Sequence, residues 1–81
     1  MHTVNFTKSA KDEFGKLPEK VRQQVAEKIR SLADNPHPPG SKKLRSYSGY
    51  RIRSGDYRIL YTVDGQSVTI YAIGNRKDIY R

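Results

Sequence analysis

Four arginines and one tyrosine in the second half of the chain are the side chains best suited to chemistry: Arg51, Arg53, Arg58, Arg76 and Tyr80. A guanidinium group is planar and donates two parallel hydrogen bonds to a phosphate. Successive side chains of a strand point to opposite faces, so Arg51 and Arg53 are expected to share one face and Ile52 to occupy the other. With Arg58 on the neighbouring strand, this spacing predicts a surface that binds phosphate.

The balance of charge favours a nucleic acid as the partner. The 81 residues include 16 Lys and Arg against eight Asp and Glu, which gives a net charge of +8. The excess is concentrated in residues 36–81, which carry a net +6, whereas residues 1–35 carry +2. Such a basic half is typical of proteins that bind nucleic acid. A basic surface that serves only solubility is the alternative.

Composition excludes several kinds of site. The chain has no Cys, which excludes disulfides and thiolate zinc sites. Its histidines are His2 and His37 and there is no carboxylate cluster, so nothing resembles a metal nuclease and no metal or cofactor is expected. A histidine acid–base pair is disfavoured because His2 is terminal and His37 lies in a Pro-rich loop. Without a leader-like start or a long apolar run, a cytoplasmic protein is expected.

The first half of the chain predicts a short strand and two helices. Residues 2–6 form a strand candidate, and Thr7 or Ser9 is suited to cap the helix that follows. Pro18 stops this helix and suits the first turn of the next one. Apolar residues recur at helical spacing in both helices: Ala10, Phe14, Leu17, Val21, Val25, Ile29 and Leu32.

The second half of the chain predicts a sheet. Residues 35–40 are too rich in Pro to continue a helix and form a loop. Strand-like runs follow at about 49–54, 56–63 and 67–74, joined by hairpin turns. The order β-α-α-β-β-β predicts one α+β domain over residues 1–81, with a helical hairpin packed on a mostly antiparallel sheet. Tyr57, Tyr61 and Tyr71 are expected in its core, and the places of Tyr47 and Tyr50 stay open.

Four short motifs follow one another in this second half. Lys43-Leu44-Arg45 precedes the first hairpin strand, and Tyr50-Arg51-Ile52-Arg53 forms that strand. The run from Gly55 to Tyr61 is similar to the pattern GxYRxxY, and the run from Ile73 to Arg81 is similar to IGxRxxxYR. Their order and spacing, with Leu17-Pro18 between the helices, resemble the RelE/ParE superfamily of bacterial and archaeal toxins, and its RelE branch in particular. The resemblance spans nearly the whole chain and implies a RelE-like fold.

The resemblance implies a toxin of a type II toxin–antitoxin system, an mRNA endonuclease that acts in the ribosomal A site and halts translation. The implied partners are the small ribosomal subunit, mRNA and a RelB-like antitoxin, with operator DNA bound only through the antitoxin complex. The family motifs carry the catalytic role onto Arg51, Arg53, Arg58, Arg76 and Tyr80. Their basic and aromatic neighbours are expected to bind RNA: Lys43, Arg45, Tyr50, Lys77 and Arg81.

RNA cleavage without a metal sets three tasks. The substrate's 2′-hydroxyl loses a proton, a phosphorane-like dianion is stabilised, and the departing 5′-oxygen gains a proton. Arginines suit the second task. Arg51 and Arg53 stand where the RelE branch has lysine, and arginine does not transfer protons. Tyr80 is then the remaining candidate for acid–base work, or for stacking on an unpaired base.

Two other interpretations stay open. A ParE-like toxin of the same fold would poison DNA gyrase by protein contact and would need no nuclease site. An inactive basic module that binds RNA or DNA is the other. Phosphate ligands that converge beside a terminal tyrosine favour the nuclease. The sequence leaves the codon preference and the oligomeric state open.

Overall fold

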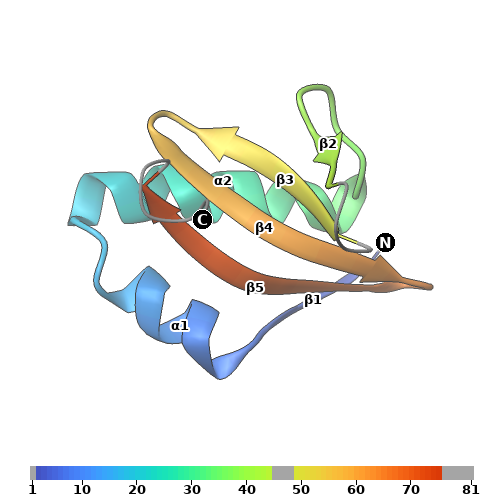
Figure 1. Cartoon of the computed structure of the whole chain (residues 1–81), viewed down its shortest axis with the longest axis horizontal. Helices are drawn as coiled ribbons and strands as arrows, with labels where there is room; N and C mark the ends of the chain where they lie inside the picture. Colours follow the sequence, from blue (N-terminus) through green and yellow to red (C-terminus); the bar gives the residue numbers. More distant parts are fainter. Residues whose placement is uncertain (1, 45–48, 76–81) are drawn as a thin grey trace.

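A computed structural model describes residues 2–44 and 49–75. The elements in chain order are β1 (Thr3–Phe6), α1 (Lys8–Gly15), α2 (Glu19–Asp34), β2 (Lys42–Lys43), β3 (Gly49–Ser54), β4 (Tyr57–Asp64) and β5 (Ser67–Asn75). The five strands form one sheet in the order β1-β5-β4-β3-β2. β1 runs parallel to β5, and the other three pairs are antiparallel. Both helices lie on the same side of the sheet (Figure 1), which confirms the predicted α+β architecture.

β2 is the element that the sequence did not predict. It consists of two lysines, which show no apolar alternation, and it becomes a strand only by pairing with β3. Lys42 lies opposite Arg51, and Lys43 lies opposite Tyr50. The Leu44 amide continues the pairing by donating to the Gly49 carbonyl at 2.9 Å. The observed order is therefore β-α-α-β-β-β-β.

The two helices begin and end close to the predicted residues. The Thr7 hydroxyl caps α1 by accepting a hydrogen bond from the Ala10 amide at 3.2 Å. Pro18 is the residue just before α2, one step earlier than predicted, and its carbonyl accepts from the Arg22 amide at 2.8 Å. Across residues 2–44 and 49–75, no helix combines the length and the apolar character that a membrane span requires.

The hydrophobic core lies between the helices and one face of the sheet. Its buried members are Ala10, Leu17, Val25, Ile29, Leu32, Ile52, Ile59, Tyr61, Val68, Ile70 and Ile73. Phe14, Val21 and Tyr57 are partly buried and pack against it, so the predicted helical stripes and two of the three tyrosines lie as expected. Because alternate side chains of β3 and β4 point into this core, the intervening ones lie on the face turned away from the helices.

Tyr71 does not belong to this core, in contrast to its predicted place. The pairing of β4 with β5 shifts by one residue between Leu60 and Tyr61. Leu60 lies opposite Ala72 and Tyr61 lies opposite Ile70, so Tyr71 comes between two paired positions of β5. The side chain is half-buried, and its hydroxyl lies 2.8 Å from the point that a Cβ on Gly49 would occupy. Gly49 shares its side of β3 with the arginines. Tyr71 therefore covers part of the face turned away from the helices.

The loop between α2 and β2 is pinned to the core by aromatic side chains. The Tyr61 hydroxyl donates a hydrogen bond to the Pro36 carbonyl at 2.7 Å. The Tyr50 ring stacks on the Tyr61 ring with centroids 5.7 Å apart, and the His37 ring meets the Tyr50 ring edge-on at 4.7 Å. Burial raises the pKa of the Tyr61 phenol above its usual 10.0. The buried phenol thus stays protonated and keeps the loop in place.

β5 extends past the end of β1, and beyond that point a side chain of α1 hydrogen-bonds to the backbone of β5. The ladder between these strands ends at Phe6, which lies opposite Ile70. Further along, Oε1 of Glu13 accepts a hydrogen bond from the Ile73 amide at 2.9 Å. This contact joins α1 to the end of β5, the strand that leads into residues 76–81.

Candidate functional site

Three arginines lie together on the face of the sheet that the helices leave uncovered. Arg53 of β3 and Arg58 of β4 are direct cross-strand partners, so their side chains are neighbours. Arg51 follows on the same side of β3, while Ile52 between them is only 3% exposed and points into the core. The predicted alternation is thereby confirmed. We call Arg51, Arg53 and Arg58 the arginine face.

The three side chains differ in exposure. Arg58 is 7% exposed, whereas Arg53 is exposed and Arg51 is intermediate. Arg58 lies on the central strand, between Arg53 of β3 and Gly74 of β5. Removing a charge from water is costly, so a cationic side chain is rarely buried to this degree unless it is paired. Arg58 is therefore the most enclosed of the three, and Arg53 is the more accessible one.

Lys42 joins the arginine face from β2. Because Lys42 lies opposite Arg51, the two side chains share one side of the sheet. Lys42, Arg51 and Arg53 line a hollow of about 290 Å³ together with Gly40. The sequence predicts Lys43 as an RNA-binding residue instead, but Lys43 lies opposite Tyr50 and so faces the other side. No sequence signal marks Lys42, because its register follows from the pairing of β2 with β3.

Tyr50 is separated from Arg51 and Arg53, which follow it on β3. It lies on the core side of β3 and packs between His37 and Tyr61. The structure thus brings together Arg51, Arg53 and Arg58 of the predicted set, and leaves Lys43 and Tyr50 on the opposite side. The other predicted residues lie outside the described part of the chain: Arg45, Arg76, Lys77, Tyr80 and Arg81.

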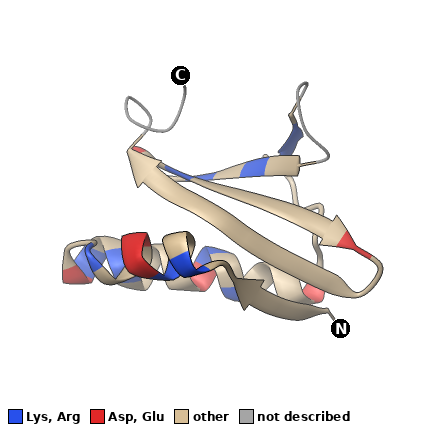
Figure 2. Cartoon of the chain, turned by 60° about the horizontal axis from the view of Figure 1, so that its bottom comes forward, with Lys and Arg blue, Asp and Glu red and all other residues tan. Residues whose placement is uncertain are grey.

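The charge on the elements differs between the two sides of the molecule. The helices carry both acidic and basic residues, whereas the charged residues of β2 and β3 are all basic (Figure 2). Two acidic residues stand near β4: Asp64 ends the strand six residues beyond Arg58, roughly 20 Å away at the rise of a strand, and Asp56 lies in the turn two residues before Arg58. The arginine face is therefore a region of concentrated positive charge suited to an anion.

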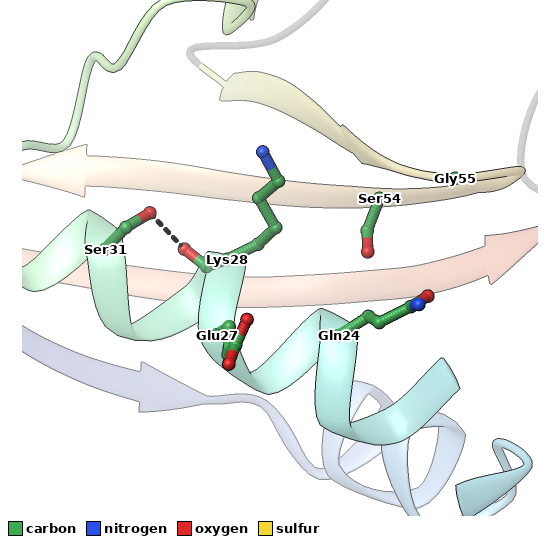
Figure 3. Close-up of a pocket in the computed structure, with 6 residues that line it drawn as sticks. All are labelled: Gln24, Glu27, Lys28, Ser31, Ser54 and Gly55. Carbon is green, nitrogen blue, oxygen red and sulfur yellow. Dashed lines mark hydrogen bonds between the residues drawn. The ribbon is translucent and has the colours of Figure 1, made fainter. Parts of the chain in front are cut away.

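A second hollow, of about 540 Å³, lies between α2 and the turn from β3 to β4 (Figure 3). Ser54 points toward the helix there, and the Ser31 hydroxyl donates to the Lys28 carbonyl at 2.6 Å. Within the part of the chain that the structure describes, the charged side chains that line it are Glu27 and Lys28, one acid and one base. This pairing offers no concentrated charge, so the smaller hollow on the arginine face is the better site for phosphate chemistry.

The arginine face can do one of the three tasks of RNA cleavage. Guanidinium groups donate hydrogen bonds to phosphate oxygens and stabilise negative charge that develops on them. They remain protonated and do not transfer protons. The described arginines therefore account for charge stabilisation, and the proton transfers require other groups.

Comparison with known proteins assigns the chain to a family. A model of the family described as "ParE toxin of type II toxin-antitoxin system, parDE" matches residues 4–80. A putative RelE-like toxin protein of Escherichia coli is 32% identical, over 98% of this chain and 90% of its own length. Toxin RelG of Mycobacterium tuberculosis is 34% identical, over 99% of this chain and 97% of its own.

Solved structures agree in fold. The RelBE2 toxin–antitoxin complex of Mycobacterium tuberculosis contains a chain of 31% identity that aligns with a TM-score of 0.82, covering 93% of this chain and 98% of that one. A chain of the archaeal RelE–RelB complex from Pyrococcus horikoshii aligns with a TM-score of 0.83 at 25% identity, covering 95% and 97%. The family model is named for ParE and these relatives for RelE. The level common to all of them is the superfamily, and this chain belongs to the RelE/ParE superfamily of toxins of type II toxin–antitoxin systems.

Proposed function

We propose that this toxin is a ribosome-dependent mRNA endonuclease that cleaves mRNA in the ribosomal A site and so inhibits translation. The observation that carries the proposal is the cross-strand pair of Arg53 and Arg58, extended by Arg51 on the same side of the sheet. Like charges placed directly opposite one another destabilise a sheet. The pair is explained if it serves to bind an anion, because guanidinium groups side by side donate hydrogen bonds to the oxygens of a phosphodiester.

The proposed reaction uses the RNA's own 2′-hydroxyl. Its oxygen forms a bond to the adjacent phosphorus, the bond from phosphorus to the 5′-oxygen breaks, and a 2′,3′-cyclic phosphate remains. The 2′-hydroxyl proton goes to a base, and the 5′-oxygen receives a proton from an acid. Arg53 and Arg58 donate to the non-bridging oxygens, where each preorganised donor contributes about 3–4 kcal/mol to transition-state stabilisation.

The proton transfers fall to a group other than the arginines. Tyr80 is our candidate, because the family motif carries the catalytic role onto it and a phenolic hydroxyl can both donate and accept a proton. An enzyme with weak acid–base groups gains most from a substrate that is held in line for attack. The ribosome would provide that orientation by fixing the mRNA in the A site, since proximity and alignment alone can contribute about 7–11 kcal/mol.

A RelB-like antitoxin is the proposed protein partner. Solved complexes of RelE-type chains with RelB from Mycobacterium tuberculosis, Pyrococcus horikoshii and Escherichia coli support this. Their toxin chains share the fold of this one over more than nine-tenths of its length. Operator DNA would be bound only through the toxin–antitoxin complex, and the toxin itself would act in the cytoplasm.

Inhibition of DNA gyrase is the second candidate function. It is favoured by the match of residues 4–80 to the family model named for ParE. A gyrase poison acts through protein contact and has no need of paired cations on an open sheet face. The arginine face is therefore the feature that ranks the nuclease first.

Two assays run in parallel distinguish these functions. The purified toxin is added to a reconstituted translation system, and mRNA integrity is followed on gels; supercoiling by purified gyrase is measured at the same toxin concentrations. Cleaved mRNA with unaffected supercoiling is the expected result. Intact mRNA with inhibited supercoiling would replace the nuclease with the gyrase poison. If neither target is affected, both functions are rejected in favour of a basic binding module.

A further inference from the structure

The arginine face contains two pairs of like charges rather than one. Arg53 lies opposite Arg58, and Lys42 lies opposite Arg51. Opposite residues in an antiparallel pair have Cβ atoms about 4.5–5.5 Å apart. Arg51 and Arg53 are two residues apart on β3, about 7 Å along the strand, and their partners lie on opposite sides of β3, so the centres of the two pairs are roughly 8 Å apart. This spacing is comparable with that of neighbouring phosphates in an extended RNA strand.

Lys42 is held in this position by the segment of residues 35–41, which we call the proline arm. Its first part is anchored by the Tyr61 hydroxyl on the Pro36 carbonyl at 2.7 Å. Asn35 closes a local turn, because its Oδ1 accepts from the His37 amide at 3.0 Å. The arm therefore starts from a point fixed on the core.

The second part of the proline arm is a tight turn that delivers Lys42 to β3. The Ser41 amide donates to the Pro38 carbonyl at 3.0 Å, and Gly40 has a φ of 93°. A proline followed by a residue of positive φ is the pattern of a type II turn. Proline also fixes φ at positions 36, 38 and 39, so the arm has little conformational freedom to lose when it presents Lys42.

The hollow beside Lys42 is suited to one small anion. Its volume of about 290 Å³ lies at the lower end of the range of roughly 300–1,000 Å³ typical of small-molecule sites. Among residues 2–44 and 49–75, its lining consists of the cations Lys42, Arg51 and Arg53 together with Gly40. These cations suit a phosphodiester group better than a base, since their N–H groups donate hydrogen bonds to phosphate oxygens.

We propose that Lys42 and Arg51 bind the RNA phosphate next to the scissile one, while Arg53 and Arg58 hold the scissile phosphate. The proposal rests on the nuclease function proposed above and adds a second subsite to it. Lys42 is a substrate-positioning residue in this account. It fixes the register of the RNA strand along β3, and the proline arm fixes Lys42.

Lys43 offers a matched control for Lys42. The two residues are adjacent, carry the same charge and are both exposed, but Lys43 faces the opposite side of the sheet. The full-length Lys42→Ala and Lys43→Ala variants are titrated with a fluorescent single-stranded RNA that is 2′-O-methylated and so cannot be cleaved. We expect Lys42→Ala to lower the slope of log K against log salt by about 0.7, the value for one phosphate contact on a single strand. Lys43→Ala is expected to keep the wild-type slope.

A second set of RNAs locates the contact. Each carries one uncharged methylphosphonate in place of a phosphate, and the position is moved along the strand. Wild-type protein is expected to lose affinity at two neighbouring positions, and Lys42→Ala is expected to be insensitive at one of them. Equal slopes for the two lysine variants, or an unchanged methylphosphonate pattern in Lys42→Ala, would overturn the subsite. So would wild-type protein that does not bind the RNA, or a Lys42→Ala defect confined to antitoxin binding.

The outcome for the subsite is separable from the outcome for the nuclease. The binding assay requires no cleavage, so the two-position pattern can hold even if ribosomal mRNA stays intact. In that case the phosphate subsite stands and the nuclease proposal fails. The converse outcome is mRNA cleavage on the ribosome with the same salt slope for Lys42→Ala and Lys43→Ala. That result retains the nuclease proposal and rejects the subsite.

Discussion

At the scale of single residues, the site is specialised for holding charge. Arginine stands at positions 51 and 53, and arginine cannot act as a general acid or base. The nearly buried Arg58 is the most firmly placed of the three. It is the residue whose loss should affect the transition state more than substrate binding.

Replacing Arg58 by Ala should lower kcat for mRNA cleavage about 10²–10³-fold, the usual effect of removing a preorganised donor to a developing oxyanion. Arg58→Lys should restore part of the rate, because it keeps the charge and loses the bidentate geometry. Single-turnover cleavage on programmed ribosomes measures both. Arg30→Ala is the matched control, since Arg30 is an exposed arginine of α2. Equal rates for Arg58→Ala and Arg30→Ala, with both proteins folded, would remove Arg58 from the site.

At the scale of elements, the sheet decides which residues meet. The alternation of Arg51, Ile52 and Arg53 could be read from the sequence, because a strand has a strict period of two. The short turn between β3 and β4 also predicts that Arg58 lies beside β3. The same period places Tyr50 with Ile52 in the core, although its aromatic character suggested RNA binding.

Lys42 could not be predicted in the same way. β2 is two residues long and has no pattern of its own, so its register depends on tertiary pairing with β3. The short β2 also depends on the proline arm, which the sequence identified only as a loop. The position of Tyr71 depends likewise on the register shift between β4 and β5, which no residue type in these strands predicts.

The contact between Glu13 and the Ile73 amide should stabilise the end of β5. Glu13→Ala is expected to cost about 1 kcal/mol in the free energy of unfolding and to speed hydrogen exchange at Ile73. Glu13→Gln should behave like wild type, because its amide oxygen still accepts the bond. Asp12→Ala is the control, as it removes the same charge from the neighbouring exposed position of α1. Equal exchange at Ile73 in the two alanine variants would show that the contact contributes nothing.

At the scale of the whole molecule, the two faces of the sheet carry different kinds of residues. The side covered by α1 and α2 holds the core, and the opposite side carries the arginine face (Figures 1 and 2). Tyr61 links the two, because it belongs to the core and also anchors the proline arm. The stability of the fold and the position of Lys42 are therefore coupled through one buried hydroxyl.

Tyr61→Phe should lower the free energy of unfolding by about 1–3 kcal/mol near neutral pH, because the buried Pro36 carbonyl loses its donor. The raised pKa of Tyr61 means that the folded protein holds this proton more tightly than the unfolded chain. The stabilisation that the Tyr61 hydroxyl gives the wild-type protein is therefore fully present below pH 10.0 and decreases as the pH rises above that value. Urea unfolding at several pH values should show the difference between wild type and Tyr61→Phe narrowing above that pH. Tyr57→Phe controls for the loss of a hydroxyl, and a constant difference across the series would contradict the argument.

The most direct test of the proposed nuclease is cleavage of mRNA on ribosomes with a single altered nucleotide. One mRNA carries ribose throughout, and a second carries a 2′-deoxy nucleotide on the 5′ side of the scissile phosphate in the A site. The toxin should cut the first mRNA on the ribosome, leave a 2′,3′-cyclic phosphate, and fail to cut the second or the ribosome-free mRNA. Ribosome-bound ribose mRNA that stays intact, or equal cutting of the deoxy-substituted one, would contradict cleavage by 2′-hydroxyl attack at the arginine face.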